Sequence, residues 1–196
     1  NAGVRLSFPL GLALDPSYPG NFFLVDQWSA ISRIRYVNLM TSTLSISGVT
    51  IPAAVAGSYA GGSVIPYVKT LYSGTANGIQ RWNQVAAFDK WICFSGGQAP
   101  QTALWAGNSD SGSHNIICKD RTNTNTLRFG LDETVNAITT RGGATLGTEQ
   151  EGINPALLSG NTARFYGPYG LVFDSAGNLY IAERGNHVIR MISRWW

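Results

Sequence analysis

One phrase occurs near both ends of the chain, and this internal repeat constrains the fold more than any other feature of the sequence. Residues 9–15 read PLGLALD, and residues 168–174 read PYGLVFD. Each phrase leads into a turn with asparagine, then a second apolar segment that ends in an acid, then a third segment that contains arginine. A unit that recurs in this way is a structural repeat, and its copies stack to bury a shared core.

Each repeat predicts short antiparallel strands. The segments are joined by turns rich in glycine, asparagine and serine, which are too short for anything but hairpins. Glycine is frequent (23 residues) and charged residues are sparse (13%), which favours strands over helices. The sequence therefore predicts an all-β fold, and no apolar run reaches the length of a membrane span.

Four copies of the unit can be traced along the chain, each expected to hold four strands. We predict blades at about residues 9–49, 50–97, 98–143 and 165–196, with residues 144–164 as a linker. The first copy is expected to close with a Thr/Ser-rich fourth strand that ends in glycine. The two middle copies are degenerate, and we place their second strands at residues 68–73 and 115–120. The last copy stops after its third strand.

The first and last copies resemble NHL repeats, a family named partly for the Asn-His pair that stands here as Asn186-His187. The long connection before Pro168 is also similar to the connection between NHL units. This resemblance implies a β-propeller, in which four-stranded sheets are arranged radially around a channel. Two departures matter: the second copy lacks the glycine after proline, and four copies are fewer than the six blades or so usual in that family.

The missing outer strand of the last blade is the most interesting consequence of the count. Residues 1–8 precede the first blade, and Gly3-Val4-Arg5-Leu6-Ser7-Phe8 alternates apolar and polar side chains as a half-buried strand does. This segment is a candidate to supply the strand, either within the chain or to another copy. A third reading takes it as a leader on the first blade, or the chain as part of a longer one.

Repeated charged residues point to structure more than to catalysis. Asp15 and Asp174 follow the first strands and are expected to accept hydrogen bonds from their own turns, with cation binding as the less favoured reading. Three acid–arginine pairs are expected on neighbouring second and third strands, each of small energy if exposed. These are Asp26–Arg35, Asp120–Arg128 and Glu183–Arg190.

Metal and thiol chemistry have little support in the sequence. The only histidines, His114 and His187, lie in predicted loops, whereas zinc sites need several converging ligands. No cofactor or metal is therefore expected. Cys93 and Cys118 permit one disulfide or two buried thiols. We favour two thiols, because Cys93 is predicted on an outer strand of one blade and Cys118 on an inner strand of the next, and such strands do not usually face each other.

Aromatic residues in or beside turns are the remaining signal. Trp28, Trp105 and Tyr169 are candidates for binding a glycan or protein ligand, with packing between blades as the alternative. An exposed tryptophan pair at the C-terminus would be costly, so we expect it to dock on a neighbouring subunit or on a segment of chain outside this sequence. The predicted assembly residues are Val4, Leu6, Phe8, Trp195 and Trp196.

These observations favour a non-enzymatic, secreted β-propeller that binds proteins and assembles with itself, as a head-to-tail oligomer or filament. The chain starts at Asn1 with no initiator methionine or signal peptide, which we interpret as a processed secreted form. Two alternatives stay open: a lyase or lactone hydrolase, by analogy of fold, and an RNA-binding NHL module. The net charge of +3 is scattered, so no nucleic-acid partner is expected.

Overall fold

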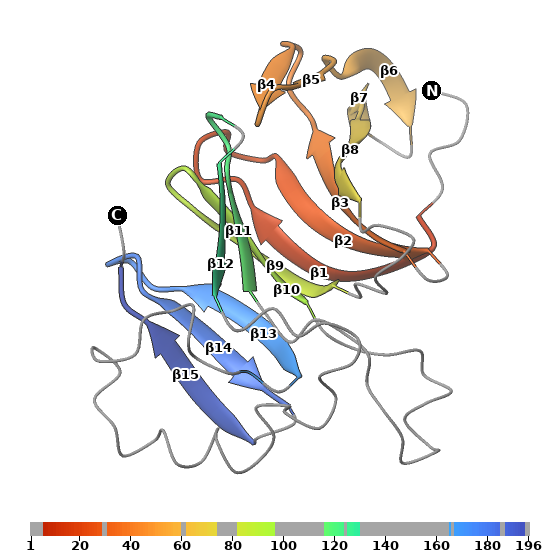
Figure 1. Ribbon diagram of the computed structural model, residues 1–196. Helices are drawn as coiled ribbons and strands as arrows, with labels where there is room; N and C mark the ends of the chain where they lie inside the picture. The colour runs from red at the N-terminus through yellow and green to blue at the C-terminus, as the bar shows by residue number, and fades with distance from the viewer. Residues whose placement is uncertain are drawn as a thin grey trace.

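The computed structural model describes residues 6–28, 31–59, 62–73, 82–96, 116–123, 125–129, 165, 167–184 and 187–194. The described residues form strands β1 to β15 and contain no helix, so the predicted all-β class is confirmed (Figure 1). It follows that no helix in this part of the chain is long and apolar enough to cross a lipid bilayer.

Three antiparallel sheets make up most of the structure. Sheet 1 has the order β1 (Phe8–Leu14), β2 (Phe22–Trp28), β3 (Ile31–Asn38), β8 (Tyr67–Ser73). Sheet 2 has the order β12 (Thr126–Phe129), β11 (Ile116–Asp120), β10 (Trp91–Gly96), β9 (Trp82–Phe88). Sheet 3 has the order β13 (Pro168–Phe173), β14 (Leu179–Glu183), β15 (Val188–Ile192). Two small hairpins, β4 (Leu44–Ile46) with β5 (Val49–Ile51) and β6 (Val55–Tyr59) with β7 (Gly62–Ile65), lie between β3 and β8 in the sequence.

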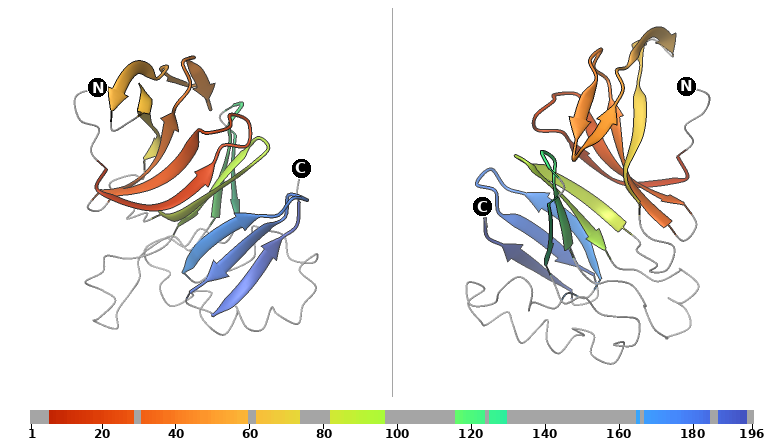
Figure 2. Two further views of the ribbon diagram at one scale, coloured as in Figure 1. Left: turned by 180° about the vertical axis from the view of Figure 1, so that it is seen from behind. Right: turned by 45° about the horizontal axis from the view of Figure 1, so that its top comes forward.

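The three sheets lie in a row, with sheet 2 between sheets 1 and 3 (Figures 1 and 2). One apolar core fills the space between sheets 1 and 2, where Phe23 and Ile34 meet Val85 and Phe94. A second core lies between sheets 2 and 3, where Trp91 and the cysteines meet Leu171 and Ile181. Sheet 2 is thus covered on both faces, while sheets 1 and 3 are each covered by it on one.

The first strands of sheets 1 and 2 approach each other closely at Gly11. A Cβ atom added there would lie 2.6 Å from Cα of Gln84 and 2.9 Å from the carbonyl oxygen of Asn83. Carbon atoms in contact prefer about 3.5–4.0 Å. Glycine at this position therefore lets β1 lie directly against β9.

Sheet 1 corrects the predicted strand assignment of the first two copies. Its fourth strand is β8, which we had placed as the second strand of the second copy. The Thr/Ser-rich segment contributes only β4, which pairs with β5. The reason is local: Ser47 and Gly48 both have positive φ (49° and 74°), so they form a two-residue hairpin turn that folds the chain back.

Sheet 2 corrects the assignment of the middle copies in the same way. The segment near Trp91 forms the second strand of the sheet rather than a fourth strand, and Ile116–Asp120 forms its third strand. Sheet 3 has three strands in the described residues, as predicted for the last copy.

The cysteines form a disulfide, so the preference for two buried thiols was wrong. It followed from the strand assignment, which put the two residues in different blades. In the structure they lie directly opposite each other on β10 and β11, with Cα atoms 4.0 Å apart. The bond staples the two central strands of sheet 2, and both residues are fully buried against sheet 3.

Candidate assembly interface

Sheets 1 and 3 are built to the same plan, position by position. Leu14 pairs with Phe22 in sheet 1, and the equivalent Phe173 pairs with Leu179 in sheet 3. The pairing of second and third strands also matches, because each repeat's arginine lies opposite the residue two before its acid. Both first strands carry an irregularity just after the leading proline. Equivalent residues of the two sheets can therefore be compared directly.

One face of this shared plan is buried in sheet 1 and open in sheet 3. Phe23, Val25, Ile34 and Tyr36 are fully buried between sheets 1 and 2. The residues at these positions in sheet 3 are again apolar or aromatic but are half-buried or exposed: Tyr180, Ala182, Ile189 and Met191. The contrast is sharpest at the third strand, where Ile34 is 0% exposed and Ile189 is 76% exposed.

The opposite face shows the reverse pattern. Leu171, Leu179 and Ile181 of sheet 3 are buried against sheet 2. Leu171 is 6% exposed, but its equivalent in sheet 1, Leu12, is 54% exposed. Leu14 beside it is also exposed, whereas Leu24, the equivalent of Ile181, is buried. The open part of this face therefore runs along β1.

These reversed exposures show that sheets 1 and 3 pack on sheet 2 through opposite faces of the repeat. Each sheet has two different apolar faces, and one repeat's buried face corresponds to the other repeat's open face. We call the open face of sheet 1, with Leu12 and Leu14, the front surface. The open face of sheet 3, with Val172, Ile189 and Met191, is the back surface. Exposed apolar residues grouped on one face make these two surfaces candidates for an interaction site.

The third strand of sheet 3 has an edge that no described strand covers. In sheet 1 the third strand, β3, pairs with β8 on its far side, but β15 has no such neighbour among the described strands. Its sequence, VIRMI, is short and carries one charge. An unpaired edge of this kind can accept another strand through main-chain hydrogen bonds.

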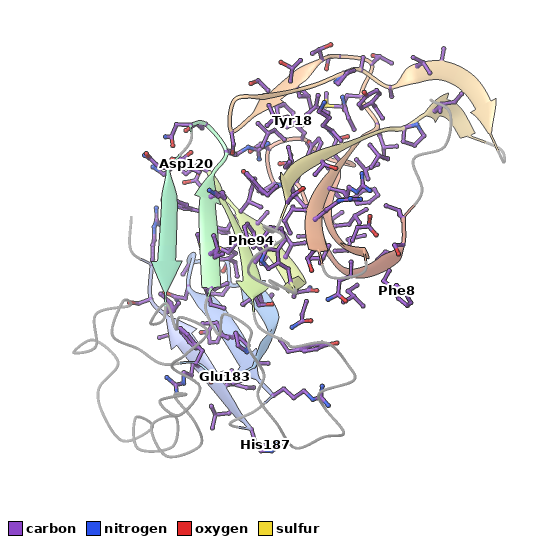
Figure 3. All side chains as sticks on the ribbon, turned by 45° about the vertical axis from the view of Figure 1, so that its right-hand side comes forward. Phe8, Tyr18, Phe94, Asp120, Glu183 and His187 are labelled. Atoms are coloured by element: carbon purple, nitrogen blue, oxygen red, sulfur yellow. A yellow bond between two sulfur atoms is a disulfide. The ribbon has the colours of Figure 1, made fainter. Side chains whose placement is uncertain are left out.

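Two of the three predicted acid–arginine pairs are confirmed. Arg35 donates two hydrogen bonds to one carboxylate oxygen of Asp26, at 3.1 and 3.0 Å. In sheet 3, Nε of Arg190 forms an ion pair with Oε1 of Glu183 (Figure 3 shows Glu183 within that sheet). In both pairs the acid side chain is fully buried, so the small energy expected for an exposed pair does not apply to them.

The strand register of sheet 2 does not favour the third predicted pair. The register of sheet 2 places Arg128 opposite Ile117, away from the end of the strand where Asp120 lies. Asp120 instead pairs with Lys90 at 3.7 Å and accepts hydrogen bonds from Thr122 and Asn123 in its own turn. These bonds outweigh the effect of burial and hold the pKa of Asp120 below its ordinary value.

A buried polar cluster around Arg121 fixes sheet 1 to sheet 2. The guanidinium group of Arg121 binds both carboxylate oxygens of Asp15. The main chain of Arg121 accepts a hydrogen bond from the N–H of Ser47, at 2.6 Å, and donates one to the carbonyl oxygen of Lys90, at 2.8 Å. The hydroxyl of Tyr36 donates to the same carboxylate at 2.6 Å. Burial raises the pKa of Tyr36, and its hydrogen bond to Asp15 raises it further. The cluster is internally satisfied and serves to hold the stack together.

The turn aspartates behave as predicted. Asp15 accepts a hydrogen bond from the main-chain N–H of Ser17, and Asp174 accepts from those of Ala176 and Asn178. Hydrogen bonds from Asn178 lower the pKa of Asp174. No group of three or more potential metal ligands occurs within the described ranges. His187 lies in the turn before β15 with a φ of 57°, and His114 is outside the described residues.

The predicted assembly and ligand residues are only partly described. Phe8 begins β1, where it lies opposite Gln27 and points away from the body of the protein, and Leu6 just before it is also exposed (Figure 3). Tyr169 is a partly exposed residue of β13, and Trp28 ends β2, so these two belong to sheets separated by sheet 2. The others lie outside the described residues: Val4, Trp105, Trp195 and Trp196.

The residues of the front and back surfaces were missed as site residues. A signal for them existed: the strand of residues 188–192 is apolar on both faces, as is the phrase of residues 9–15. A strand with two apolar faces is expected between two layers. At either end of a stack, it leaves one face open.

The sequence matches no model of a known protein family and no curated protein. Function is therefore inferred from the arrangement of the three sheets.

Proposed function

We propose that this protein is a non-enzymatic, secreted scaffold of NHL-like β-propeller blades that binds other proteins and assembles with copies of itself. The observation that carries the proposal is the reversed exposure of equivalent residues in sheets 1 and 3. The two outer sheets each expose apolar residues, and the exposed end faces of a repeat stack need to be covered for the protein to stay soluble.

The open edge of β15 supports the same function through strand completion. In sheet 1 the equivalent third strand is completed by β8, so the repeat accommodates a fourth strand at this place. The residues ahead of β1 are the proposed donor, and the receiving strand belongs to another copy. The disulfide supports a location outside the cell, because such bonds persist in oxidising compartments.

Assembly can be tested by sedimentation velocity over a range of protein concentrations, with electron microscopy of the same samples. We expect particles that grow with concentration, as closed rings or filaments. A compact monomer at every concentration would refute the proposal. Removing residues 1–6, which precede β1 and its pairing with β2, tests strand completion separately: a smaller or weaker assembly is expected, and unchanged assembly would exclude this segment as the donor.

A further inference from the structure

We infer that the joint between copies is a continuation of the stack, with the back surface of one copy seated on the front surface of the next. The inference rests on the proposed self-assembly and specifies its geometry. Strand completion and face stacking are different contacts, so each can fail without the other.

The two interfaces inside the chain serve as templates for this joint. Sheet 1 uses its Phe23–Tyr36 face to cover sheet 2, and the back surface of sheet 3 is the same face of the repeat. Sheet 3 uses its Leu171–Ile181 face to cover sheet 2, and the front surface is the equivalent face of sheet 1. A back surface seated on a front surface therefore repeats an arrangement that the chain already contains twice.

The chemistry of the two surfaces suits this occupant. The back surface offers Val172, Ile189 and Met191, and the front surface offers Leu12 and Leu14; each residue is uncharged and exposed. Burying apolar surface of this kind drives association without directional bonds. Three charged residues among those described share the front face of sheet 1: Arg35 is paired with Asp26, and Arg33 lies opposite Asp26 in the strand register.

Gly170 adds a second, independent feature to the back surface. It is the equivalent of Gly11, whose missing side chain lets β1 lie against the main chain of β9. At Gly170 an added Cβ would meet Ala182, at 3.4 Å, and no other residue in the part of the chain that the structure describes. The bare main chain of β13 is thus open in one copy and available for the close approach that β1 makes inside the chain.

A joint between two different surfaces is heterologous. Each copy contributes one of each, so the contact generates a ring if the rotation closes and a filament if it does not. It also means that blocking one surface leaves the other functional, and this gives a decisive experiment.

We propose two double variants, Leu12→Lys/Leu14→Lys to block the front surface and Val172→Lys/Ile189→Lys to block the back surface. Each places two ammonium groups in an apolar contact, so the dissociation constant of the joint is expected to rise at least about 100-fold. Val55→Lys, at an exposed apolar residue of the β6–β7 hairpin, is the matched control and should assemble as the unmodified protein does.

The result expected is that each double variant is monomeric alone and that an equimolar mixture forms a dimer and stops there. The mixture retains one front surface and one back surface that match. Sedimentation velocity and native mass spectrometry, with one variant isotopically labelled, identify the dimer as mixed. Circular dichroism and the urea midpoint of each variant verify that it is folded.

Three outcomes would overturn the inference. If either double variant assembled like the unmodified protein, the joint would lie elsewhere. If removal of residues 1–6 then abolished assembly in the same series of experiments, strand completion would be the sole contact between copies. Dimerisation of one double variant by itself would show a contact between identical surfaces. A monomeric unmodified protein would overturn the proposed function along with this inference.

Gly170→Ala provides a finer test. We expect it to leave folding intact while it weakens the joint about 10-fold, since the added methyl group would separate β13 from the next copy. Assembly unaffected by this substitution would contradict the close approach.

Discussion

Gly11 and Gly170 occupy the same position in two copies of the repeat, but among the described residues only Gly11 has the main chain of another sheet against it. In Gly11→Ala the new methyl group would lie 2.6 Å from Cα of Gln84. Since such atoms prefer about 3.5–4.0 Å, β1 must retreat from β9 by roughly 1 Å. Gly11 does not have a left-handed φ, so backbone strain plays no part.

The expected cost follows from two opposing effects. Overpacking at a close contact costs about 1–3 kcal/mol. Replacing glycine with alanine also reduces the entropy of the unfolded chain, which stabilises the fold by about 0.4–1 kcal/mol. The net expectation for Gly11→Ala is a loss of about 1–2 kcal/mol. Gly170→Ala gains the entropic term without a clash, so its stability should be unchanged or up to about 1 kcal/mol higher.

Urea denaturation followed by tryptophan fluorescence measures this difference, because Trp82 and Trp91 are buried in the two cores. The three proteins should be compared at a concentration where all are monomeric, so that assembly does not contribute to stability. Equal urea midpoints for Gly11→Ala and Gly170→Ala would refute the packing argument.

Three further predictions concern the interior. Arg121→Met leaves the buried carboxylate of Asp15 without its partner and should cost about 3–5 kcal/mol in urea denaturation, whereas adding Asp15→Asn should restore much of it; a double variant as unstable as the sum of the single ones would contradict this. The pKa of Tyr36 is raised in the folded protein, so the contribution of Tyr36 to the free energy of unfolding is complete below pH 10. Above pH 10 this contribution falls by about 1.4 kcal/mol per pH unit. Tyr36→Phe should flatten this alkaline loss in thermal melts, and an unchanged slope would exclude Tyr36. Cys93→Ala/Cys118→Ala removes a cross-link between residues 25 apart and should cost about 3 kcal/mol. Thiol labelling of the unmodified protein should find no thiol until a reductant is added.

The fold class and the two end repeats were predictable because their signals are local. Hairpin turns and apolar alternation lie within residues 9–38 and 168–192, and the pairing registers there follow from the sequence. The acid–arginine pairs of sheets 1 and 3 were found for the same reason. Their burial was not, because it depends on which neighbouring segments cover each pair.

The middle of the chain was misassigned because its pairing is not local. The fourth strand of sheet 1 is separated from β3 by two hairpins, and no short-range pattern marks β8 as its partner. Moving that strand shifted each later assignment, including the placement of Cys93 and Cys118 in different blades. The front and back surfaces were equally hard to predict from the sequence, because strands with the same apolar pattern are buried in one sheet and exposed in another.

The distant origin of β8 has a consequence for how the protein is made. During synthesis the first three strands of sheet 1 leave the ribosome well before residue 73, so β3 remains an open edge until β8 arrives. Closing this longer loop costs more conformational entropy than closing the neighbouring hairpins. Nascent chains held close together in that interval can exchange their β8 strands. We therefore expect the spacing of ribosomes on the message, and not only the stability of the finished fold, to influence whether sheet 1 is completed by its own chain.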